Sequence, residues 1–200
     1  NDSQVFRFSD FQIQKDSQVL DVACGTADST IALAKAGIHS VTGIDISEGM
    51  LKVGEEKVKD LNLSSAINFK VEECENLSFN DNTFDAAFIA FGIRNFEDKK
   101  KSLNELRRVL KDNGHLLILE LSVPQNKILL SLYKLYFLNI LPFIGKKISG
   151  DSKAYTYLPQ SVMNFPKPKD FLQMMEECGF KNVRQKALTF GLCRIYEGYA

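Results

Sequence analysis

The chain has 200 residues, of which 44% are hydrophobic and 25% are charged, so it can bury the core of one domain of ordinary size. Basic and acidic residues number 25 each, and this balance gives no support to nucleic acid as a partner. The four cysteines and two histidines lack ligand spacing, so we expect neither a metal site nor a disulfide framework. Scattered reduced thiols are typical of a cytoplasmic protein.

Neither an export signal nor a membrane-spanning segment is predicted. The stretch from Asn1 to Asp16 is polar and has no apolar core. The longest apolar run, Ile128 to Ile144, contains Lys134 and a proline, so it does not suit a span across about 30 Å of hydrocarbon.

Strand and helix patterns alternate along most of the chain. In chain order we expect a strand from Gln18 to Ala23, a helix from Asp28 to Ala36, a strand from Ser40 to Asp45, an amphipathic helix from Glu48 to Leu61 capped by Ser47, strands from Ile67 to Val71 and from Phe84 to Ala90, a helix from Asp98 to Leu110 and a strand from His115 to Leu121. This alternation predicts an α/β fold, a mostly parallel, doubly wound sheet with helices on both faces.

The last third of the chain does not continue this regular alternation of strands and helices. Asn126 to Ser149 is apolar and aromatic, and Gly150 to Pro168 is expected to be a loop because it holds three prolines. A helix is expected from Lys169 to Cys178, ended by Gly179. Strands from Asn182 to Leu188 and from Phe190 to Tyr199, joined by a tight turn, predict an antiparallel C-terminal hairpin.

The turn after the first strand reads VLDVACGTADST, Val19 to Thr30, and looks like a nucleotide-binding turn. From Gly25 onward it satisfies only the first position of G-x-G-x-x-G, because Ala27 stands where a second glycine is usual. A dinucleotide pyrophosphate is therefore disfavoured. A smaller nucleoside such as S-adenosylmethionine (AdoMet) needs less space, with Gly25 giving close approach and Asp21 facing its ammonium group.

A second anchor is Asp45, which ends the second strand 20 residues after Gly25, about the spacing of an acid that accepts the ribose hydroxyls. A plain turn or cap acid is the alternative for Asp45. Ile46 and Met50 suit packing on the adenine, although each is also an ordinary core residue type.

A third anchor is the stretch VEECENLSF, Val71 to Phe79. Glu73 can accept from the adenine amino group, and a backbone N–H near Cys74 can bind a ring nitrogen. The alternative is a solvated acidic loop, since Glu72 and Glu75 flank these residues.

In this order the anchors resemble the class I AdoMet-dependent methyltransferases, and within them the ubiquinone/menaquinone biosynthesis C-methyltransferases of the UbiE family. The resemblance runs from about Ser17 to Tyr199. The segments that carry it are LDVACGTAD (Leu20 to Asp28), GIDISEGML (Gly43 to Leu51), NTFDAAFIAFGIRNFED (Asn82 to Asp98), RRVLKDNGHLLILELS (Arg107 to Ser122) and DSKAYTYLPQSV (Asp151 to Val162).

The resemblance implies a Rossmann-like seven-stranded sheet, AdoMet as cofactor, and methylation of a ring carbon of a polyprenylated benzoquinol or naphthoquinol. The cofactor contacts that it implies fall on Thr26, Asp45, Glu73, Cys74 and Ala90. The sequence departs from the family pattern at four places. Glycine is usual at Ala27, and a shorter acid or asparagine followed by alanine is usual at Glu73-Cys74. A hydroxyl residue is often found at Ala90, and proline-glycine is expected at Asp112-Asn113. We also expect the family's N-terminal segment before the first strand to be missing.

Arg94 and Asn95 in FGIRN are the candidate catalytic residues, because this segment follows the fourth strand at the carboxyl edge of the sheet. Arg94 would stabilise a developing phenolate or orient a water, and Asn95 would orient Arg94 or the substrate. The alternative is a salt bridge from Arg94 to Glu97 or Asp98.

We expect one methyltransferase domain over residues 1–200, with a substrate-covering insertion at about 123–168. Ile128 to Ile144 is either a core helix pair or a lid that receives the prenyl tail and touches a membrane surface through Lys134, Lys146 and Lys147. Tyr155, Tyr157 and Ser161 are candidates for the quinol pocket, and a homodimer is compatible with the sequence. The rival functions are methylation of another small molecule and a catalytically weak AdoMet-binding scaffold subunit.

Overall fold

A computed structural model describes residues 13–124, 126–135 and 152–200. Its strands form one sheet in the order β3-β2-β1-β4-β5-β7-β6. They are β1 (Gln18–Val22), β2 (Ser40–Asp45), β3 (Ile67–Val71), β4 (Phe84–Ala90), β5 (Leu110–Leu121), β6 (Lys181–Leu188) and β7 (Cys193–Tyr199). Strands β1 to β5 pair in parallel, whereas β7 is antiparallel to both β5 and β6. The prediction of a mostly parallel sheet with an antiparallel C-terminal hairpin is confirmed.

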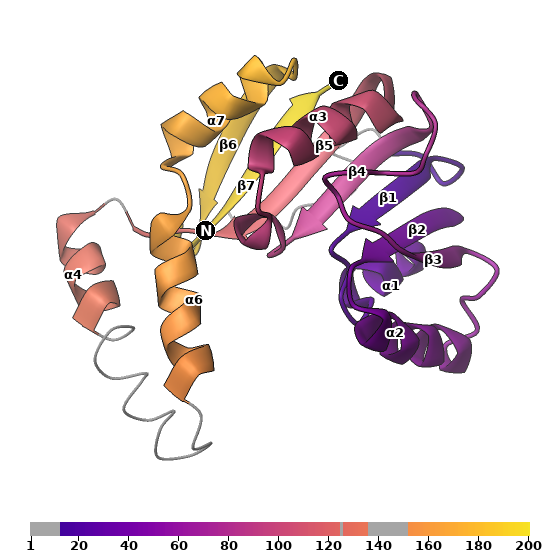
Figure 1. Cartoon of the computed structure of the whole chain (residues 1–200), viewed down its shortest axis with the longest axis horizontal. Helices are drawn as coiled ribbons and strands as arrows, with labels where there is room; N and C mark the ends of the chain where they lie inside the picture. Colours follow the sequence, from indigo (N-terminus) through magenta and orange to yellow (C-terminus); the bar gives the residue numbers. More distant parts are fainter. Residues whose placement is uncertain (1–12, 125, 136–151) are drawn as a thin grey trace.

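Helices cover both faces of this sheet, whereas α4 (Lys127–Leu135) and α6 (Ser152–Asn164) project beyond the ends of its strands (Figure 1). The covering helices are α1 (Asp28–Lys35), α2 (Glu48–Asp60), α3 (Lys99–Val109) and α7 (Pro168–Glu177). Short 3-10 segments are η2 (Ile93–Asn95) and η4 (Thr189–Gly191). Side chains alternate along β1, so that Val19 packs with Ile31 of α1, while Leu20 packs in a second cluster with α3 and α7.

The carboxyl ends of the parallel strands are the part of the sheet that positions the candidate site. Strand order reverses between β1 and β4, which lie side by side in the middle of the sheet. In such sheets ligands bind beyond the carboxyl ends of the strands at this reversal. The turns after β1, β2, β3 and β4 all come to this edge.

Three element predictions are wrong. Gly150 to Pro168 is not a loop, because α6 occupies Ser152–Asn164 with Pro159 inside it. The fifth strand begins at Leu110, because Leu110 pairs with Phe84 before an irregularity in the ladder. The last strand begins at Cys193, because Thr189–Gly191 form η4 where a strand was expected from Phe190.

No described helix is long and apolar enough to cross a membrane. The cysteines are all free thiols, buried at Cys24, Cys74 and Cys178 and half-buried at Cys193.

Candidate cofactor and substrate site

A cavity of about 560 Å³ opens at the carboxyl ends of β1, β2 and β4. It gathers residues from four separate turns. The predicted residues that line it are Gly25, Asp45, Ile46, Met50, Glu73, Cys74 and Asn95. Residues that sequence reasoning missed include Ala23, Ser47, Glu75, Phe91, Gly92 and Phe96. The three from the β4 turn flank or lie within FGIRN, so that segment was the available signal for them.

Asp45 joins two of these turns. Its Oδ2 accepts from the backbone N–H of Gly25 at 2.9 Å, and its Oδ1 accepts from the backbone N–H of Ser47 at 2.8 Å. Ser47 in turn caps α2 by accepting from the N–H of Met50. A carboxylate has about four acceptor positions, so Asp45 keeps acceptor capacity on the cavity side for hydroxyl groups.

The apolar part of the cavity is unusually exposed. Ile46 is 74% exposed, Met50 43% and Phe91 40%, although all three are large hydrophobic residues. A Cβ on Gly25 would lie 2.9 Å from the Cε of Met50, so glycine keeps this wall open. Exposed apolar side chains beside a carboxylate fit a nucleoside, whose base is flat and apolar on its faces and whose ribose carries hydroxyls.

Asp21 lies behind the cofactor turn and is fully buried. Its Oδ2 accepts from the hydroxyls of Ser29 at 2.7 Å and Thr30 at 2.6 Å, whereas its Oδ1 has no hydrogen-bond partner among the described residues. Burial raises the pKa of Asp21 to about 6, against the opposing effect of the two hydroxyls. A buried acceptor without a donor is a place where a ligand ammonium or an ordered water would be stabilised.

Ala27 has a left-handed backbone, with φ of 68°, and its side chain is fully buried. The methyl group faces Gly54 of α2, where an added Cβ would come within 3.0 Å of the Cβ of Ala27. Glycine at position 54 therefore makes room for the methyl group.

Lys57, also on α2, holds the same turn. Its Nζ donates to the carbonyl oxygen of Thr26 at 3.1 Å, to the Thr26 hydroxyl at 3.0 Å and to Asp28 at 2.8 Å. Thr26 thus faces Lys57 and is not among the residues lining the cavity. Lys57 was missed because it lies 31 residues from Thr26 in sequence.

The acidic loop after β3 is ordered by its own hydrogen bonds. Glu72 accepts from the backbone N–H of Ser78 at 2.8 Å and pairs with Lys70. Glu73 is exposed at the cavity rim. Cys74 is buried with its Sγ 4.0 Å from the carbonyl oxygen of Ser102, and burial raises the pKa of its thiol to about 12, so it is a neutral wall residue.

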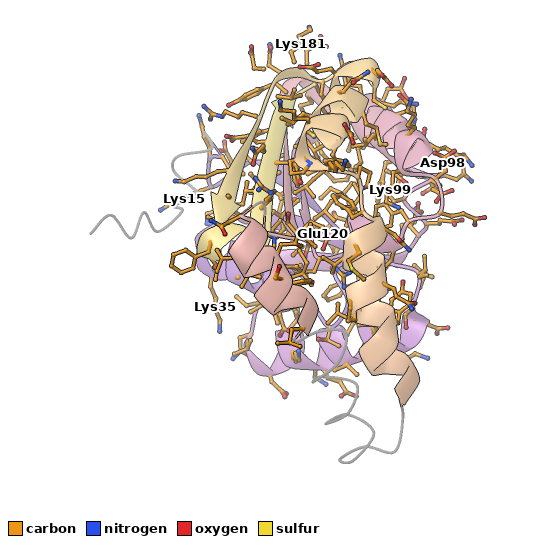
Figure 2. All side chains as sticks on the ribbon, turned by 90° about the vertical axis from the view of Figure 1, so that its left-hand side faces the viewer. Lys15, Lys35, Asp98, Lys99, Glu120 and Lys181 are labelled. Atoms are coloured by element: carbon orange, nitrogen blue, oxygen red, sulfur yellow. The ribbon has the colours of Figure 1, made fainter. Side chains whose placement is uncertain are left out.

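Arg94 is bound by an acid that sequence reasoning did not identify. Its Nη1 donates to Glu120 Oε1 at 2.7 Å and to the carbonyl oxygen of Phe91, and its backbone N–H donates to Glu120 Oε2 at 3.1 Å. Glu120 on β5 is fully buried and lies in the interior, away from surface lysines such as Lys181 (Figure 2). The partner of Arg94 is therefore Glu120, not Glu97 or Asp98.

Asn95 and Tyr157 meet across the cavity edge. The Tyr157 hydroxyl donates to Asn95 Oδ1 at 2.8 Å, which joins α6 to η2 over 62 residues of sequence. Tyr157 is 55% exposed, so most of its ring remains accessible. A candidate substrate residue and a candidate catalytic residue are thus brought together.

The other candidates lie elsewhere. Ala90 ends β4 beside Leu119 and does not line the cavity. Ser161 donates to the carbonyl oxygen of Leu158 within α6. The side chains of Tyr155 and Lys134 and the residues Lys146 and Lys147 lie outside what the structure describes.

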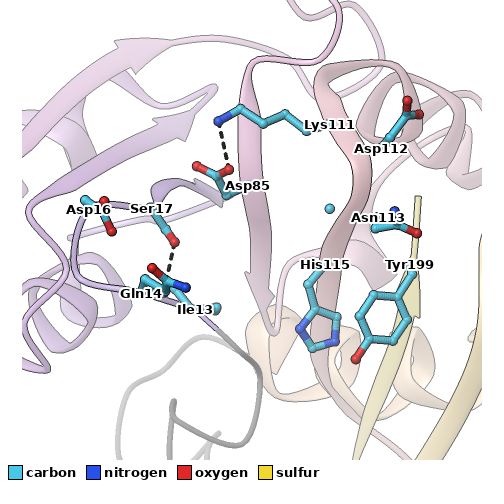
Figure 3. A pocket seen from close by; sticks show the side chains of 11 residues that line it. Ile13, Gln14, Asp16, Ser17, Asp85, Lys111, Asp112, Asn113, His115 and Tyr199 are labelled. Atoms are coloured by element: carbon cyan, nitrogen blue, oxygen red, sulfur yellow. Dashed lines mark hydrogen bonds and ion pairs between the residues drawn. The ribbon is translucent and has the colours of Figure 1, made fainter.

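A second cavity, of about 460 Å³, lies at the opposite edge of the sheet (Figure 3). Asp85, Lys111, His115 and Tyr199 are among its polar lining residues. Asp85 accepts from Lys111 at 2.7 Å and from the backbone N–H of Gln18 at 2.8 Å, and the His115 and Tyr199 rings stack. Since this edge holds the amino ends of the parallel strands, the first cavity is the candidate site.

A sequence model of the ubiE/COQ5 methyltransferase family matches residues 6–200. This chain belongs to the ubiE/COQ5 methyltransferase family. The Bacteroides fragilis protein named demethylmenaquinone methyltransferase is 46% identical over 90% of this chain and 74% of its own length. The protein of Geobacter sp. (strain M21) named ubiquinone/menaquinone biosynthesis C-methyltransferase UbiE is 46% identical over 90% of this chain and 77% of its own.

The fold of this ubiE/COQ5 family member is also that of solved methyltransferases. A SAM-dependent methyltransferase from Aquifex aeolicus superposes with a TM-score of 0.69 at 21% identity, covering 96% of this chain and 86% of that one. The resemblance and the Rossmann-like fold class are therefore confirmed. The cavity residues of the family member fit AdoMet by the carboxylate of Asp45 and by the exposed apolar wall of Ile46, Met50 and Phe91.

Proposed function

We propose that this chain transfers the methyl group of AdoMet to a ring carbon of a polyprenyl quinol, as demethylmenaquinol or the benzoquinol of ubiquinone synthesis. The observation that carries the proposal is the cavity at the carboxyl ends of β1, β2 and β4, in which Asp45 and an apolar wall meet the FGIRN turn. The names of the relatives, with 46% identity over 90% of the chain, support the quinone ring as substrate.

In this proposal AdoMet lies between the β1, β2 and β3 turns. Asp45 accepts the ribose hydroxyls, Ile46 and Met50 pack on the adenine, and Glu73 and the backbone at Cys74 bind its edge. Gly25 gives close approach to the methionine end. Asp21, Thr26 and Ala90 do not line the cavity and act on the cofactor indirectly. Asp21 favours the ammonium through an ordered water at the acceptor that lacks a donor among the described residues.

Bound AdoMet supplies an electrophilic methyl group on a sulfonium. The ring carbon becomes a good nucleophile only when a neighbouring hydroxyl loses its proton, so the chain must stabilise negative charge on that oxygen. Arg94 does not line the cavity, so it does this indirectly, through an ordered water at its buried Nε–H, which has no acceptor among the described residues. Arginine stays protonated at neutral pH and is not the base itself.

Asn95 and Tyr157 orient the ring. Since Asn95 Oδ1 accepts from Tyr157, its amide nitrogen is the donor that it presents to a quinol oxygen. The exposed ring of Tyr157 provides a face for the quinol, with Tyr155 and Ser161 farther along the same helix. Correct positioning of donor and acceptor carbons supplies on the order of 7–11 kcal/mol of such a barrier.

The direct test supplies labelled AdoMet and a demethylated prenyl quinol to the purified chain. We expect one label on a ring carbon of the product. AdoMet binding without any transfer would contradict the proposal and favour a scaffold subunit. Quinone profiles of cells that lack the protein would identify the ring and the tail together.

The first variant to test is Asp45→Ala. We expect weaker AdoMet binding by about 1.5–3 kcal/mol, because hydrogen bonds to a charged group are lost. Asp85→Ala is the matched control, since Asp85 also accepts from backbone, the N–H of Gln18, but lies at the opposite edge of the sheet. An unchanged dissociation constant in Asp45→Ala would remove Asp45 from the cofactor site.

A further inference from the structure

Phe91, the first residue after β4, has a strained backbone. Its φ is 58°, in the left-handed region that is unfavourable for residues other than glycine. Two hydrogen bonds hold it there. Its backbone N–H donates to the carbonyl oxygen of Leu119 at 2.8 Å, and its own carbonyl oxygen accepts from Nη1 of Arg94. Such strain persists where surrounding structure enforces it, and it is concentrated at functional sites.

The side chain of Phe91 lines the cofactor cavity and is 40% exposed. The other exposed apolar residues of this cavity, Ile46 and Met50, follow β2. Strand β1 lies between β2 and β4, and neighbouring strands are about 4.8 Å apart, so the ends of β2 and β4 are about 10 Å apart. An adenine packed on Ile46 and Met50 therefore leaves the Phe91 ring accessible to a different group.

The turn after β4 also lies directly against the turn after β1. A Cβ on Gly92 would lie only 2.6 Å from the Cβ of Ala23, so glycine at this position permits the close approach. Ala23 lines the cavity and has a left-handed backbone as well, with φ of 54°. The Phe91 ring is thus fixed beside the β1 turn, where the methionine end of AdoMet lies in the proposed function.

A flat apolar face at this place suits the methyl acceptor better than the cofactor. The ribose, carboxylate and ammonium groups of AdoMet are polar and require hydrogen-bonding partners. The acceptor ring is planar and apolar on its faces, and aromatic rings pair in offset-stacked arrangements. Asn95 lines the cavity four residues after Phe91, so an amide is available at the edge of a stacked ring, where a quinol carries its oxygens.

We propose that Phe91 is the platform for the acceptor, so that the quinol ring stacks on its side chain with a ring carbon towards the methyl group of AdoMet. The inference rests on the proposed function, because it concerns the acceptor of that reaction. The left-handed backbone ends the alternation of side chains along β4 and directs the Phe91 ring into the cavity. Acceptors with a flat aromatic ring are thereby favoured over acceptors without one.

Phe91→Leu keeps an apolar side chain but removes the flat face. We expect the KM for a short-tailed demethylated naphthoquinol to rise by roughly 2- to 12-fold, the range for loss of one aromatic pair, while the Tm and the AdoMet dissociation constant stay unchanged. Phe91→Tyr should keep the KM of the unaltered chain, because it retains the ring.

Phe190→Leu is the matched control for this variant. Phe190 is also exposed and has a φ of 56°, but it lines neither described cavity. Its replacement should leave the KM unchanged. An unchanged KM in Phe91→Leu, or an equal rise in Phe190→Leu, would overturn the proposal.

A binding measurement separates the acceptor from the cofactor as the partner of the ring. An aromatic face also attracts a sulfonium by a cation–π interaction. If that were the role of Phe91, Phe91→Leu would weaken the binding of AdoMet but not of S-adenosylhomocysteine, which has no sulfonium charge. This result with an unchanged KM for the quinol would overturn the proposal. We expect both dissociation constants to equal those of the unaltered chain.

The chain contains no tryptophan, so Phe91→Trp introduces a single fluorophore at the proposed platform. A quinone in contact with an excited indole ring quenches its emission. We expect a short-tailed demethylated naphthoquinone to quench Phe91→Trp saturably, and Phe190→Trp only in proportion to its concentration. Absence of saturable quenching in Phe91→Trp would contradict the platform.

These experiments distinguish failure of this inference from failure of the proposed function. Saturable quenching of Phe91→Trp by a chain that transfers no methyl group would refute quinol methylation and support the platform. Methyl transfer with the same KM in Phe91→Leu as in the unaltered chain would support quinol methylation and refute the platform.

Discussion

Ala27 has an unfavourable backbone conformation, but its methyl group is well accommodated by packing. Its φ of 68° is disfavoured for alanine by roughly 1–2 kcal/mol relative to glycine. Its methyl group is fully buried and meets the space that Gly54 leaves on α2. Gly54 on the neighbouring helix therefore compensates for alanine in place of the family's glycine. The Ala27 methyl group does not enter the cofactor cavity.

This pairing predicts non-additive effects in a double-mutant cycle. Gly54→Ala should destabilise the chain by about 1–3 kcal/mol, because the new methyl group meets that of Ala27. In an Ala27→Gly background the same change should be neutral or stabilising, because alanine favours a helix over glycine by about 1 kcal/mol. Denaturant unfolding of the four chains measures the coupling. Additive free energies would contradict the contact, and an unchanged AdoMet dissociation constant in Ala27→Gly would show that the methyl group does not weaken binding.

We expect Asp21 to link cofactor binding to stability. Its pKa in the folded chain, about 6, lies above the ordinary 3.8, so its contribution to stability is present below pH 3.8 and is lost as pH rises through 6. We expect Asp21→Asn to remove this loss and to be more stable than the unaltered chain above pH 6 by up to about 3 kcal/mol. Thermal unfolding between pH 4 and 8 measures it.

The same variant should bind AdoMet more weakly, because asparagine carries no charge for the ammonium. An identical pH dependence of the two chains would show that Asp21 is not the group that titrates. A more stable chain with poorer cofactor binding would be a trade-off between stability and function at one buried carboxylate.

At the scale of elements, the site depends on how η2 is held. This short segment presents Asn95 to the cavity, and its Arg94 is fixed to β5 by Glu120 through both backbone and side chain. Glu120 also accepts from the backbone N–H of Leu121 at 2.7 Å. One buried carboxylate thus sets the distance between the β4 turn and the neighbouring strand.

Glu120→Gln should lower the free energy of unfolding by about 3–5 kcal/mol, because the buried guanidinium of Arg94 loses its counter-charge. Replacing both partners, as in Glu120→Gln with Arg94→Met, should recover most of that stability, since no buried charge remains. Methyl transfer should stay lost in the double variant if Arg94 stabilises the phenolate. Unfolding curves and product yield measured together distinguish the roles, and full transfer by the double variant would make Arg94 only structural.

The predictions were correct for elements that local sequence defines and wrong for elements that depend on tertiary contacts. The bounds of β2, β3 and β4 were predicted correctly, because local runs of strand-forming residues define them. The cap at Ser47 likewise marks where α2 begins. Helix α6 was missed because Pro159 disfavours a helix locally, while packing of α6 against η2, with the Tyr157–Asn95 hydrogen bond, compensates. The tight turn after Leu188 was predicted, but the last strand was expected from Phe190, because Phe190 has strand propensity and its positive φ leaves no local signal.

At the scale of the whole molecule, one edge of the sheet carries the chemistry. Gly25, Asp45, the β3 loop and FGIRN are spread over some 70 residues of sequence, yet parallel pairing brings the ends of their strands together. Helix α6 reaches the same edge, where Tyr157 donates to Asn95, so the proposed cofactor and substrate residues adjoin one another.

The sequence by itself determined the fold class, the family, the cofactor and seven of the residues that line the cavity, because these depend on local periodicity and on motifs at strand ends. Only the tertiary structure decided which partners those residues have. Glu120 with Arg94, Lys57 with Thr26 and Gly54 with Ala27 lie 26 to 31 residues apart. Such contacts depend on how the helices pack on the sheet. Tertiary packing of this kind leaves no periodic pattern in the sequence, so it could not be predicted.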